Sequence, residues 1–277
     1  MRAVLALCVL LTLADPGAAR QDGEERKAWN VPFQPFRVVG NVHFVGATGV
    51  SAFLIVTPAG SILLDGGLPE TAPQIARNIA ALGFRLADVK YLLNSHAHFD
   101  HAGGLAELKR LTGASMVASG PDAPTLRAGG GADMPPVTVD RAVADGETVS
   151  LGDTTLIARV TSGHTRGCTT WTTTAIEQGR PYRVVFYCST SVVDRLVDNA
   201  GYPEIAADYE RTFEKLRTMQ ADVFLAAHPF LFTMEAKVKN MKPGASNPFV
   251  DPAEFRRFVD GSEREFRAAL KKQQPQR

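Results

Sequence analysis

The chain has almost no excess of charge of either sign. Its 277 residues include 30 lysines and arginines and 29 aspartates and glutamates, so the formal net charge is +1. Proteins that bind phosphate backbones need a basic excess, and this balance argues against a nucleic acid partner. The chain also lacks internal repeats, low-complexity tracts and long linkers after residue 19. We therefore expect a single domain over residues 20–277 that acts on a small molecule. Nothing in the sequence demands a second subunit, so we expect a monomer.

Only the N-terminus carries a long apolar run. The stretch "MRAVLALCVLLTLADPGAAR" places Arg2 before the run Ala3–Ala14, with small residues at Gly17–Ala19. A membrane anchor is the alternative, but it would need about 20 apolar residues, and this run stops at Asp15. The pattern is typical of a signal peptide, here over residues 1–19. We expect cleavage near Ala19, a periplasmic location and no stable membrane insertion.

Cysteine is scarce. The chain has three cysteines, and Cys8 would be lost with the signal peptide. The remaining pair, Cys168 and Cys188, would enter an oxidising compartment, where two cysteines tend to form a bridge. The strands expected just after Cys168 and just before Cys188 can be neighbours. We predict a Cys168–Cys188 disulfide.

Strand patterns followed by helical patterns occur twice along the chain, which indicates a layered α/β sandwich. Strands are predicted at Arg37–Val45, Ala52–Thr57, Ser61–Leu64, Val89–Asn94, Glu147–Ser150, Thr154–Val160, Thr169–Ala175, Tyr182–Tyr187 and Val223–Ala226. Helices are predicted near residues 71–83 and at Ala102–Leu111, Ile205–Met219 and Pro252–Lys272. The Gly- and Pro-rich stretch Ser119–Val137 is expected to be a functional loop that borders the site.

The stretch "NSHAHFDHAGG" (Asn94–Gly104) concentrates metal-binding side chains at the end of a predicted strand. It holds His96, His98, Asp100 and His101. A catalytic zinc ion needs three protein ligands and one position left for water, so these four residues exceed one site. On an extended segment His96, His98 and Asp100 would converge while His101 points elsewhere. This arrangement suits two ions better than one.

Further ligands must come from distant segments. His164 lies in the polar turn "TSGHTRG", and His228 follows a predicted strand in "FLAAHPF". His43 sits inside the strand pattern "NVHFVG", where an ordinary strand histidine is the better interpretation. The alternatives for the cluster are a chance run of surface histidines and a closed structural zinc site. Six candidate ligands with no thiolate among the clustered ones favour a pair of open, catalytic sites.

The pattern His96-x-His98-x-Asp100-His101 followed by His164 and His228 resembles the metallo-β-lactamase superfamily, whose fold is a four-layer αββα sandwich. The stretches "VSAFLIVTPAGSILLDGGLPE", "NSHAHFDHAGG" and "GHTRGCTTW" are similar to those of subclass B3. The resemblance covers nearly all of the mature chain. It implies two zinc ions per chain. One ion would bind His96, His98 and His164, and the other would bind Asp100, His101 and His228.

The resemblance also implies roles around the metals. Asp65, in "LLDGG", matches an aspartate that steadies the metal ligands, although a simple turn residue before two glycines is an equal alternative. Ser189 and Ser191 match hydroxylic residues that help to hold the substrate carboxylate, with ordinary turn hydroxyls as the alternative. Cys188 has a second interpretation as a metal ligand, since another lactamase subclass uses a nearby cysteine. Phe99, Phe230 and Phe232 are candidates for the cleft wall, although core packing is the simpler role.

The superfamily contains several classes of hydrolase, and the residues at the end of the strand Tyr182–Tyr187 help to distinguish them. Many members other than the lactamases carry an aspartate there that bridges both metals, whereas this chain has "CSTS" at Cys188–Ser191. The resemblance therefore implies hydrolysis of the β-lactam amide bond of penicillins, cephalosporins and carbapenems by a zinc-bound hydroxide, with antibiotic resistance as the result. Asp100 would help to return a proton. The alternatives are a periplasmic hydrolase of lactones or thioesters and a non-catalytic zinc-binding protein.

Overall fold

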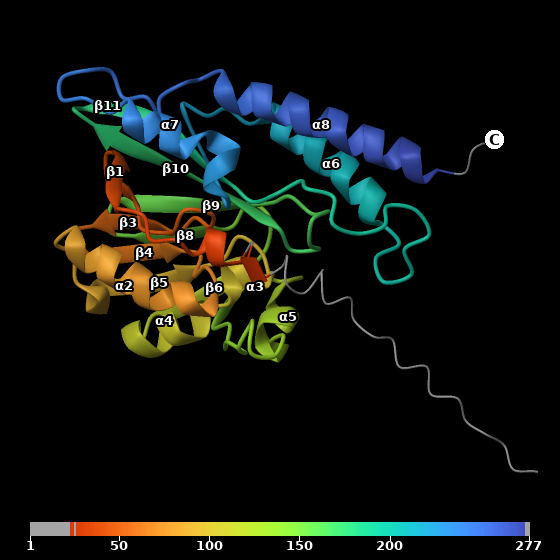
Figure 1. The fold of residues 1–277 in the computed structure, drawn as a ribbon, viewed down its shortest axis with the longest axis horizontal. Coiled ribbons are helices and arrows are strands. Elements are labelled where there is room, and N and C mark those ends of the chain that lie inside the picture. The colour runs from red at the N-terminus through yellow and green to blue at the C-terminus, as the bar shows by residue number, and fades with distance from the viewer. Residues whose placement is uncertain (1–22, 25, 275–277) are drawn as a thin grey trace, which may run out of the picture.

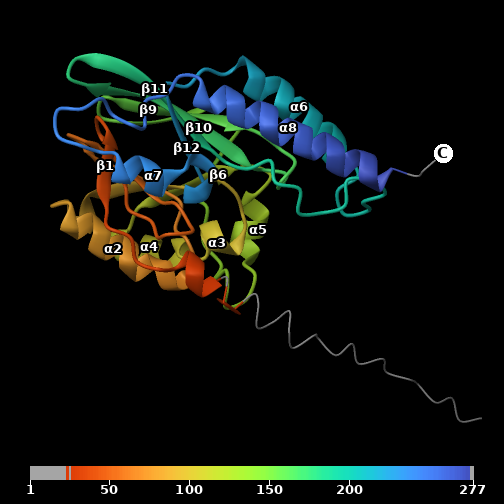
Figure 2. The same cartoon turned by 45° about the horizontal axis from the view of Figure 1, so that its top comes forward.

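A computed structural model describes residues 23–24 and 26–274. Two β-sheets lie face to face, and helices cover the outer face of each (Figure 1). The helices on one side are α2 (Ala72–Ala81), α3 (Phe99–Ala102), α4 (Leu105–Thr112) and α5 (Ala123–Ala128). The other side carries α6 (Ile205–Thr218) and α8 (Glu254–Gln273), which lie side by side (Figure 2). The predicted four-layer αββα sandwich is confirmed. The predicted signal peptide, residues 1–19, lies outside the described residues.

The first sheet has seven strands in the order β1-β2-β3-β4-β5-β6-β7. They are β1 (Phe36–Val39), β2 (Val42–Phe44), β3 (Phe53–Thr57), β4 (Gly60–Leu64), β5 (Val89–Leu93), β6 (Ser115–Ser119) and β7 (Arg141–Val143). The second sheet has five strands in the order β12-β11-β10-β9-β8. They are β8 (Thr148–Leu151), β9 (Thr154–Val160), β10 (Thr169–Glu177), β11 (Arg180–Tyr187) and β12 (Val223–Ala226).

The residues of the first sheet alternate between two hydrophobic cores. Phe53 and Ile55 of β3 point into the core between the sheets, which continues to α6 and α8. Leu54, between them, belongs to the second core, where it meets Ile75 and Ile79 of α2. Successive side chains of a strand point to opposite faces, so a sheet covered on both faces is apolar at every position. This explains the unbroken apolar run in "FLIV" of β3.

Two predicted elements are each divided by glycine. The single strand expected at Arg37–Val45 is a hairpin of β1 and β2, because Gly40 turns the chain with a φ of +52°. A Cβ at Gly40 would also lie 2.6 Å from the Ile176 carbonyl oxygen. The helix expected at Ala102–Leu111 is split at Gly103–Gly104 into α3 and α4.

Four short strands and helices lie in segments where none was predicted. They are β6, β7, α5 and α7 (Met234–Lys239). The stretch Ser119–Val137 is thus no open loop, because it contains α5 and buries Leu126 and Val137. The glycines and prolines of this stretch predicted a loop, because its few apolar residues form no helical pattern. Among the described residues no helix is both long and apolar enough to cross a membrane.

Candidate metal centre

The predicted ligands leave the ends of strands from both sheets and meet at one edge of the sandwich. His96 and His98 follow β5 of the first sheet, and His164 lies in the connection from β9 to β10 of the second. The ring centroids of these three histidines are 4.7–4.8 Å apart. Their candidate ligand atoms all lie within 4.8 Å of one another. We call these residues the three-histidine cluster.

A second cluster adjoins the first. Asp100 Oδ2 lies 3.0 Å from His101 Nε2 and 3.4 Å from His228 Nε2, and the two Nε2 atoms are 3.3 Å apart. The rings of His96 and His101 connect the clusters, with centroids 4.3 Å apart. The expectation that His101 would point away is wrong, because Phe99–Ala102 is the helix α3 and the alternation of an extended strand does not apply to it.

Hydrogen bonds at the far side of three rings orient them toward the clusters. His164 Nδ1 donates to the Ser191 carbonyl (2.8 Å), and His228 Nδ1 donates to the Gly49 carbonyl (2.9 Å). His96 Nδ1 lies 3.0 Å from Ser95 Oγ. A ring that donates through Nδ1 carries its lone pair on Nε2, the form that binds a metal ion.

Asp65 lies behind the second cluster. Its Oδ2 is 3.6 Å from His101 Nδ1, and its Oδ1 accepts hydrogen bonds from Ser95 N (2.7 Å) and Asn94 Nδ2 (3.1 Å). The residue has a φ of +64°, a left-handed conformation that costs about 1–3 kcal/mol outside glycine and is kept only where the surroundings demand it. The Asp65 carboxylate thus lies between the His101 ring and the backbone of the segment that leads to His96.

Burial and neighbouring charges set the protonation of the rings. Burial lowers the pKa of His164 to about 3 and that of His228 to about 4. Burial also lowers the pKa of His96. Burial opposes the charge on His101 as well, but Asp100 and Asp65 outweigh it and raise its pKa to about 10. Burial disfavours ionisation of Asp100, yet His101 and His228 prevail and lower its pKa, so the carboxylate is ionised at neutral pH.

The donor set fits divalent metal ions. Imidazoles and an ionised carboxylate are the ligands that zinc accepts, and they converge here from three segments of the chain. His101, whose pKa is raised, would release its extra proton when a metal ion binds. The buried His101 Nδ1 has no hydrogen-bond partner among the described residues. A buried polar cluster of this kind is costly unless something compensates it, and bound divalent metal would do so.

The end of β11 carries the predicted disulfide and the two serines. Cys168 and Cys188 are joined in a disulfide with their Cα atoms 6.0 Å apart, and both are fully buried. Cys188 Sγ lies 3.6 Å from His96 Nδ1, so the bridge supports a candidate ligand and its sulfur is not free to be one. Ser189 is buried, and its Oγ accepts a hydrogen bond from Ser191 N (3.1 Å). The side chain of Ser191 is exposed.

The remaining candidates from the sequence, one histidine and three phenylalanines, differ in whether they lie near the clusters. His43 lies outside the clusters, where its ring packs on Phe84 with centroids 5.0 Å apart, as expected of an ordinary strand histidine. Phe232 is buried in the core. Phe99 and Phe230 are 40% and 62% exposed, so core packing is not their role. Phe230 instead stacks on the His228 ring at 5.1 Å, which places it at the rim of the metal centre.

Two residues near the centre were not predicted from the sequence. The Trp29 ring lies 5.5 Å from that of His228, and Trp29 belongs to none of the sequence motifs described above. Asp122, from the connection between β6 and α5, is buried and accepts hydrogen bonds from the segments on which His96, His98 and His164 lie. Its only sequence signal was its place in the stretch Ser119–Val137, which was expected to border the site.

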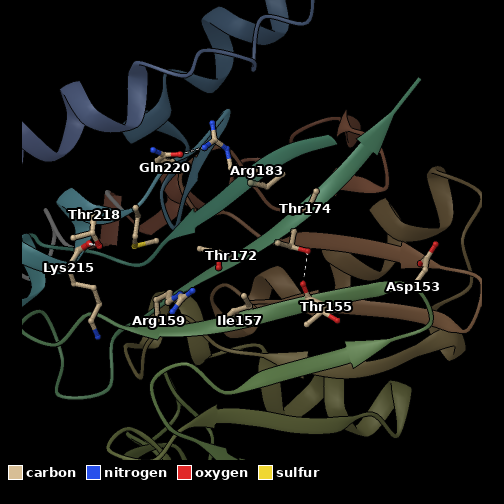
Figure 3. A pocket seen from close by; sticks show the side chains of 13 residues that line it. Asp153, Thr155, Ile157, Arg159, Thr172, Thr174, Arg183, Lys215, Thr218 and Gln220 are labelled. Atoms are coloured by element: carbon tan, nitrogen blue, oxygen red, sulfur yellow. Dashed lines mark hydrogen bonds between the residues drawn. The ribbon is translucent and has the colours of Figure 1, made fainter. Parts of the chain in front are cut away.

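A separate groove of about 660 Å³ lies on the outer face of the second sheet (Figure 3). None of the predicted ligands lines it, and threonines of β9 and β10 form much of its floor. Two of its cations are already paired, Arg183 with Asp222 at 2.8 Å and Lys215 with Asp145 at 2.9 Å. An antiparallel sheet commonly leaves one face in water, and this groove has that character.

Comparison with known proteins agrees with this geometry. Residues 45–228 match the family model of the metallo-beta-lactamase superfamily. The fold is similar to BJP-1, a subclass B3 metallo-beta-lactamase of Bradyrhizobium japonicum, with 43% identity, a TM-score of 0.86 and coverage of 89% of this chain and 97% of that one. It is also similar to the FEZ-1 metallo-beta-lactamase from Legionella gormanii, with 39% identity, a TM-score of 0.85 and coverage of 88% and 98%.

Two curated relatives are described as hydrolases of other kinds. A UPF0173 metal-dependent hydrolase of Anaeromyxobacter dehalogenans is 30% identical over 233 residues, which cover 80% of this chain and 79% of the relative. A hydroxyacylglutathione hydrolase of a Bradyrhizobium species is 38% identical over 115 residues, which cover 41% of this chain and 39% of the relative. Both of these relatives are described as hydrolases.

Proposed function

This chain belongs to the metallo-beta-lactamase superfamily and is a hydrolase of that fold, and from this premise we propose that it hydrolyses the amide bond of β-lactams with two zinc ions. Penicillins, cephalosporins and carbapenems are the proposed substrates. The observation that carries the proposal is the end of β11, where Cys188–Ser191 offers a disulfide and hydroxyl groups and no acid. Without a bridging carboxylate, the second metal depends on the cluster of Asp100, His101 and His228.

The two clusters define the proposed ligand sets. His96, His98 and His164 would hold one zinc ion, and Asp100, His101 and His228 the other. When bound, such ions would lower the pKa of a water molecule toward neutrality and would polarise the substrate carbonyl, whose carbon atom the water attacks. The chain itself supplies rings that are already neutral and oriented, His164 and His228 among them.

Other residues of the centre have proposed tasks in binding and proton transfer. Asp100 is ionised at neutral pH, so it can accept a proton and return it to the nitrogen that leaves the opened ring. The exposed hydroxyl of Ser191 is suited to donate to the substrate carboxylate. Ser189 would do the same with its hydroxyl proton while its oxygen accepts from Ser191 N. No covalent intermediate with the protein is required.

The cellular setting is part of the proposal. A signal peptide over residues 1–19 would place a single domain of residues 20–277 in the periplasm, where it would act as a monomer. β-Lactams act in that compartment, so their hydrolysis there would cause antibiotic resistance. The Cys168–Cys188 disulfide is compatible with an oxidising compartment.

A hydrolase of thioesters or lactones is the second candidate. The similarity to a hydroxyacylglutathione hydrolase favours it, although that similarity covers only 41% of this chain. The strand end without an acid argues against it.

One set of assays separates these candidates. Purified chain from residue 20 onward should open a chromogenic cephalosporin and a carbapenem, lose that activity with a chelator and recover it with zinc. Hydrolysis of a thioester or lactone substrate alone would support the second candidate. Bound zinc without hydrolysis of any β-lactam would refute the proposed substrate, and hydrolysis that survives the chelator would refute the metal mechanism.

A further inference from the structure

A single buried carboxylate connects the two segments that form the three-histidine cluster. Asp122 is 4% exposed. Its Oδ2 accepts hydrogen bonds from Ala97 N (2.9 Å) and Thr165 Oγ1 (2.8 Å), and its Oδ1 accepts from Gly167 N (2.8 Å). All three donors come from outside its own segment, which lies between β6 and α5.

These donors are immediate neighbours of the candidate ligands. Ala97 lies between His96 and His98, and Thr165 directly follows His164. The first pair of histidines comes from the first sheet and His164 from the second. Two other hydrogen bonds also join these parts of the chain, from Thr169 N to the Ser95 carbonyl (2.7 Å) and from Trp171 Nε1 to the Asn94 carbonyl (3.1 Å), but neither reaches the residue between His96 and His98 or the residue after His164. Asp122 therefore controls how closely the ligand backbones approach one another.

The motif "GHTRG" is explained by the same carboxylate. A Cβ at Gly167 would lie 2.6 Å from Asp122 Cγ and would overlap Ser119 Oγ, so only glycine allows the backbone to come this close. Thr165 provides the hydroxyl that fills the remaining acceptor position of Oδ2. Thr165 and Gly167 of the motif thus act on Asp122, and none of the metal or substrate roles proposed above uses them.

We propose that Asp122 is a positioning residue, which sets the geometry of the three-histidine metal site by holding the His96–His98 segment against the His164 segment. This inference rests on the proposed metal site but not on the proposed substrate. A carboxylate is required because it accepts at both oxygens. An asparagine would turn an amide N–H toward Ala97 N or Gly167 N, and two donors would then face each other.

Metal binding and metal spectroscopy test the proposal without any substrate. Asp122→Asn should weaken binding of cobalt(II) and zinc at one of two sites by about 10–100-fold, as for other residues that orient metal ligands. It should also change the d–d absorption of the cobalt(II) protein. Thr165→Val should give a smaller change in the same direction, and Thr165→Ser should restore the wild-type spectrum. In the Asp122→Asn background, Thr165→Val should add little, because both changes remove the same hydrogen bond.

Asp140→Asn is the matched control. Asp140 also accepts a hydrogen bond from a backbone amide, that of Met116 within β6 (2.6 Å), and it pairs with Lys109, but it contacts no ligand segment. This variant should lower the Tm and leave both metal affinities and the cobalt spectrum unchanged.

The outcomes are decisive in each direction. If Asp122→Asn lowers the Tm but keeps wild-type metal affinity and the wild-type cobalt spectrum, Asp122 has only a structural role and the proposal is wrong. If Asp122→Asn fails to fold, the Thr165→Val and Thr165→Ser pair decides by the same readouts. If the metal effects are found but no β-lactam is hydrolysed, the positioning role stands and only the proposed substrate fails.

Discussion

At the scale of single residues, hydrogen bonds determine which ring nitrogen of two candidate ligands carries the proton. The bond from His164 Nδ1 to the Ser191 carbonyl and that from His228 Nδ1 to the Gly49 carbonyl leave both Nε2 atoms directed at the clusters. Burial keeps both rings neutral, so no proton has to leave them when a metal binds at neutral pH. The ligand side chains are therefore organised before the ion arrives.

Replacing one ligand should remove one ion. His164→Ala should halve the metal content from two ions to one, because two histidines are too few for a stable three-ligand site. The fold should persist, since the side chain lies at the surface end of the centre and is not part of either hydrophobic core. Metal analysis of the purified variant, together with circular dichroism, measures both effects.

His43→Ala is the control for this prediction. His43 is a buried histidine of β2 that lies outside both clusters. It should lower the Tm and keep the full metal content. Equal metal content in His164→Ala and the wild type would show that the ligand set is wrong.

At the scale of elements, glycines let the junction of α3 and α4 approach the turn that follows β4 of the first sheet. Gly66 N donates to the His101 carbonyl (2.9 Å), and Gly104 N donates to the Gly67 carbonyl (3.0 Å). These bonds hold the turn after β4 against the junction of α3 and α4. Since Asp65 precedes this turn, the same contact places its carboxylate beside His101.

A methyl group at this junction should be destabilising. In Gly104→Ala the Cβ would overlap the Gly66 carbonyl oxygen and lie 3.1 Å from Ala72 Cβ. The backbone φ of −84° suits alanine, so the cost is steric, about 1–3 kcal/mol of unfolding free energy as for other overpacked sites. Chemical denaturation measures it. Gly120→Ala, with nothing within 4 Å of its Cβ, should change the stability little, and a similar loss in both variants would contradict this account.

The helices α6 and α8 are joined by an ion pair that should respond to pH. Glu263 of α8 accepts hydrogen bonds from Arg267 Nε (2.9 Å) and from Arg217 of α6. Burial opposes ionisation of Glu263, but Arg267 and Arg217 outweigh it and lower its pKa below the ordinary 4.5. A carboxyl with a lowered folded-state pKa stabilises the fold above its unfolded pKa, and this contribution disappears as the pH falls through the folded value.

Thermal melts of Glu263→Gln against pH test this sign. Above about pH 5.5 the variant should be less stable than the wild type by a constant amount of about 1–2 kcal/mol, because the arginines are partly exposed. The difference should shrink below pH 4.5, where the unfolded wild type takes up a proton. Glu107→Gln removes a surface pair with Arg110, which also lowers the pKa of Glu107, so it should show a dependence of the same sign but smaller size because solvent screens an exposed pair. A difference that grows in acid would contradict the prediction.

At the scale of the whole molecule, the disulfide links the connection after β9 to the end of β11. It closes a loop with a sequence separation of 20 residues, and both cysteines are buried beside His96. In the chain-entropy description, closing such a loop stabilises the fold by about 3 kcal/mol.

Removing the bridge should therefore lower stability and loosen one ligand. The double variant Cys168→Ser/Cys188→Ser should lose about 3 kcal/mol of unfolding free energy. It should also bind metal more weakly at the site that contains His96. Reduced wild-type protein should behave similarly, while the oxidised protein before and after mock treatment is the control. An unchanged Tm on reduction would show that the bridge adds no stability.

Much of the fold was visible in the sequence because local patterns carry it. Strands such as β5, β9 and β12 stand out as short apolar runs bounded by turns, and their ends lead directly to candidate ligands. The hairpin within Arg37–Val45 was not visible, because it depends on the approach of Gly40 to Ile176 from the other sheet. Helix α5 was not predicted for a different reason, because the proline and glycine residues around it indicate a loop.

The sequence by itself determined the chemistry of this protein. The spacing of His96, His98, Asp100 and His101, with His164 and His228 at later strand ends, specifies which side chains are available to bind metal. Residue types and their order are sufficient for that, because ligand chemistry belongs to individual side chains.

Only the tertiary structure decided how these side chains are held. Asp122 is 25 residues from Ala97 and 45 from Gly167 in sequence, yet it accepts hydrogen bonds from both backbones. Such contacts leave no periodic pattern, because a backbone amide is present at almost every residue. The packing of the two sheets determines which of these amides reach one buried carboxylate.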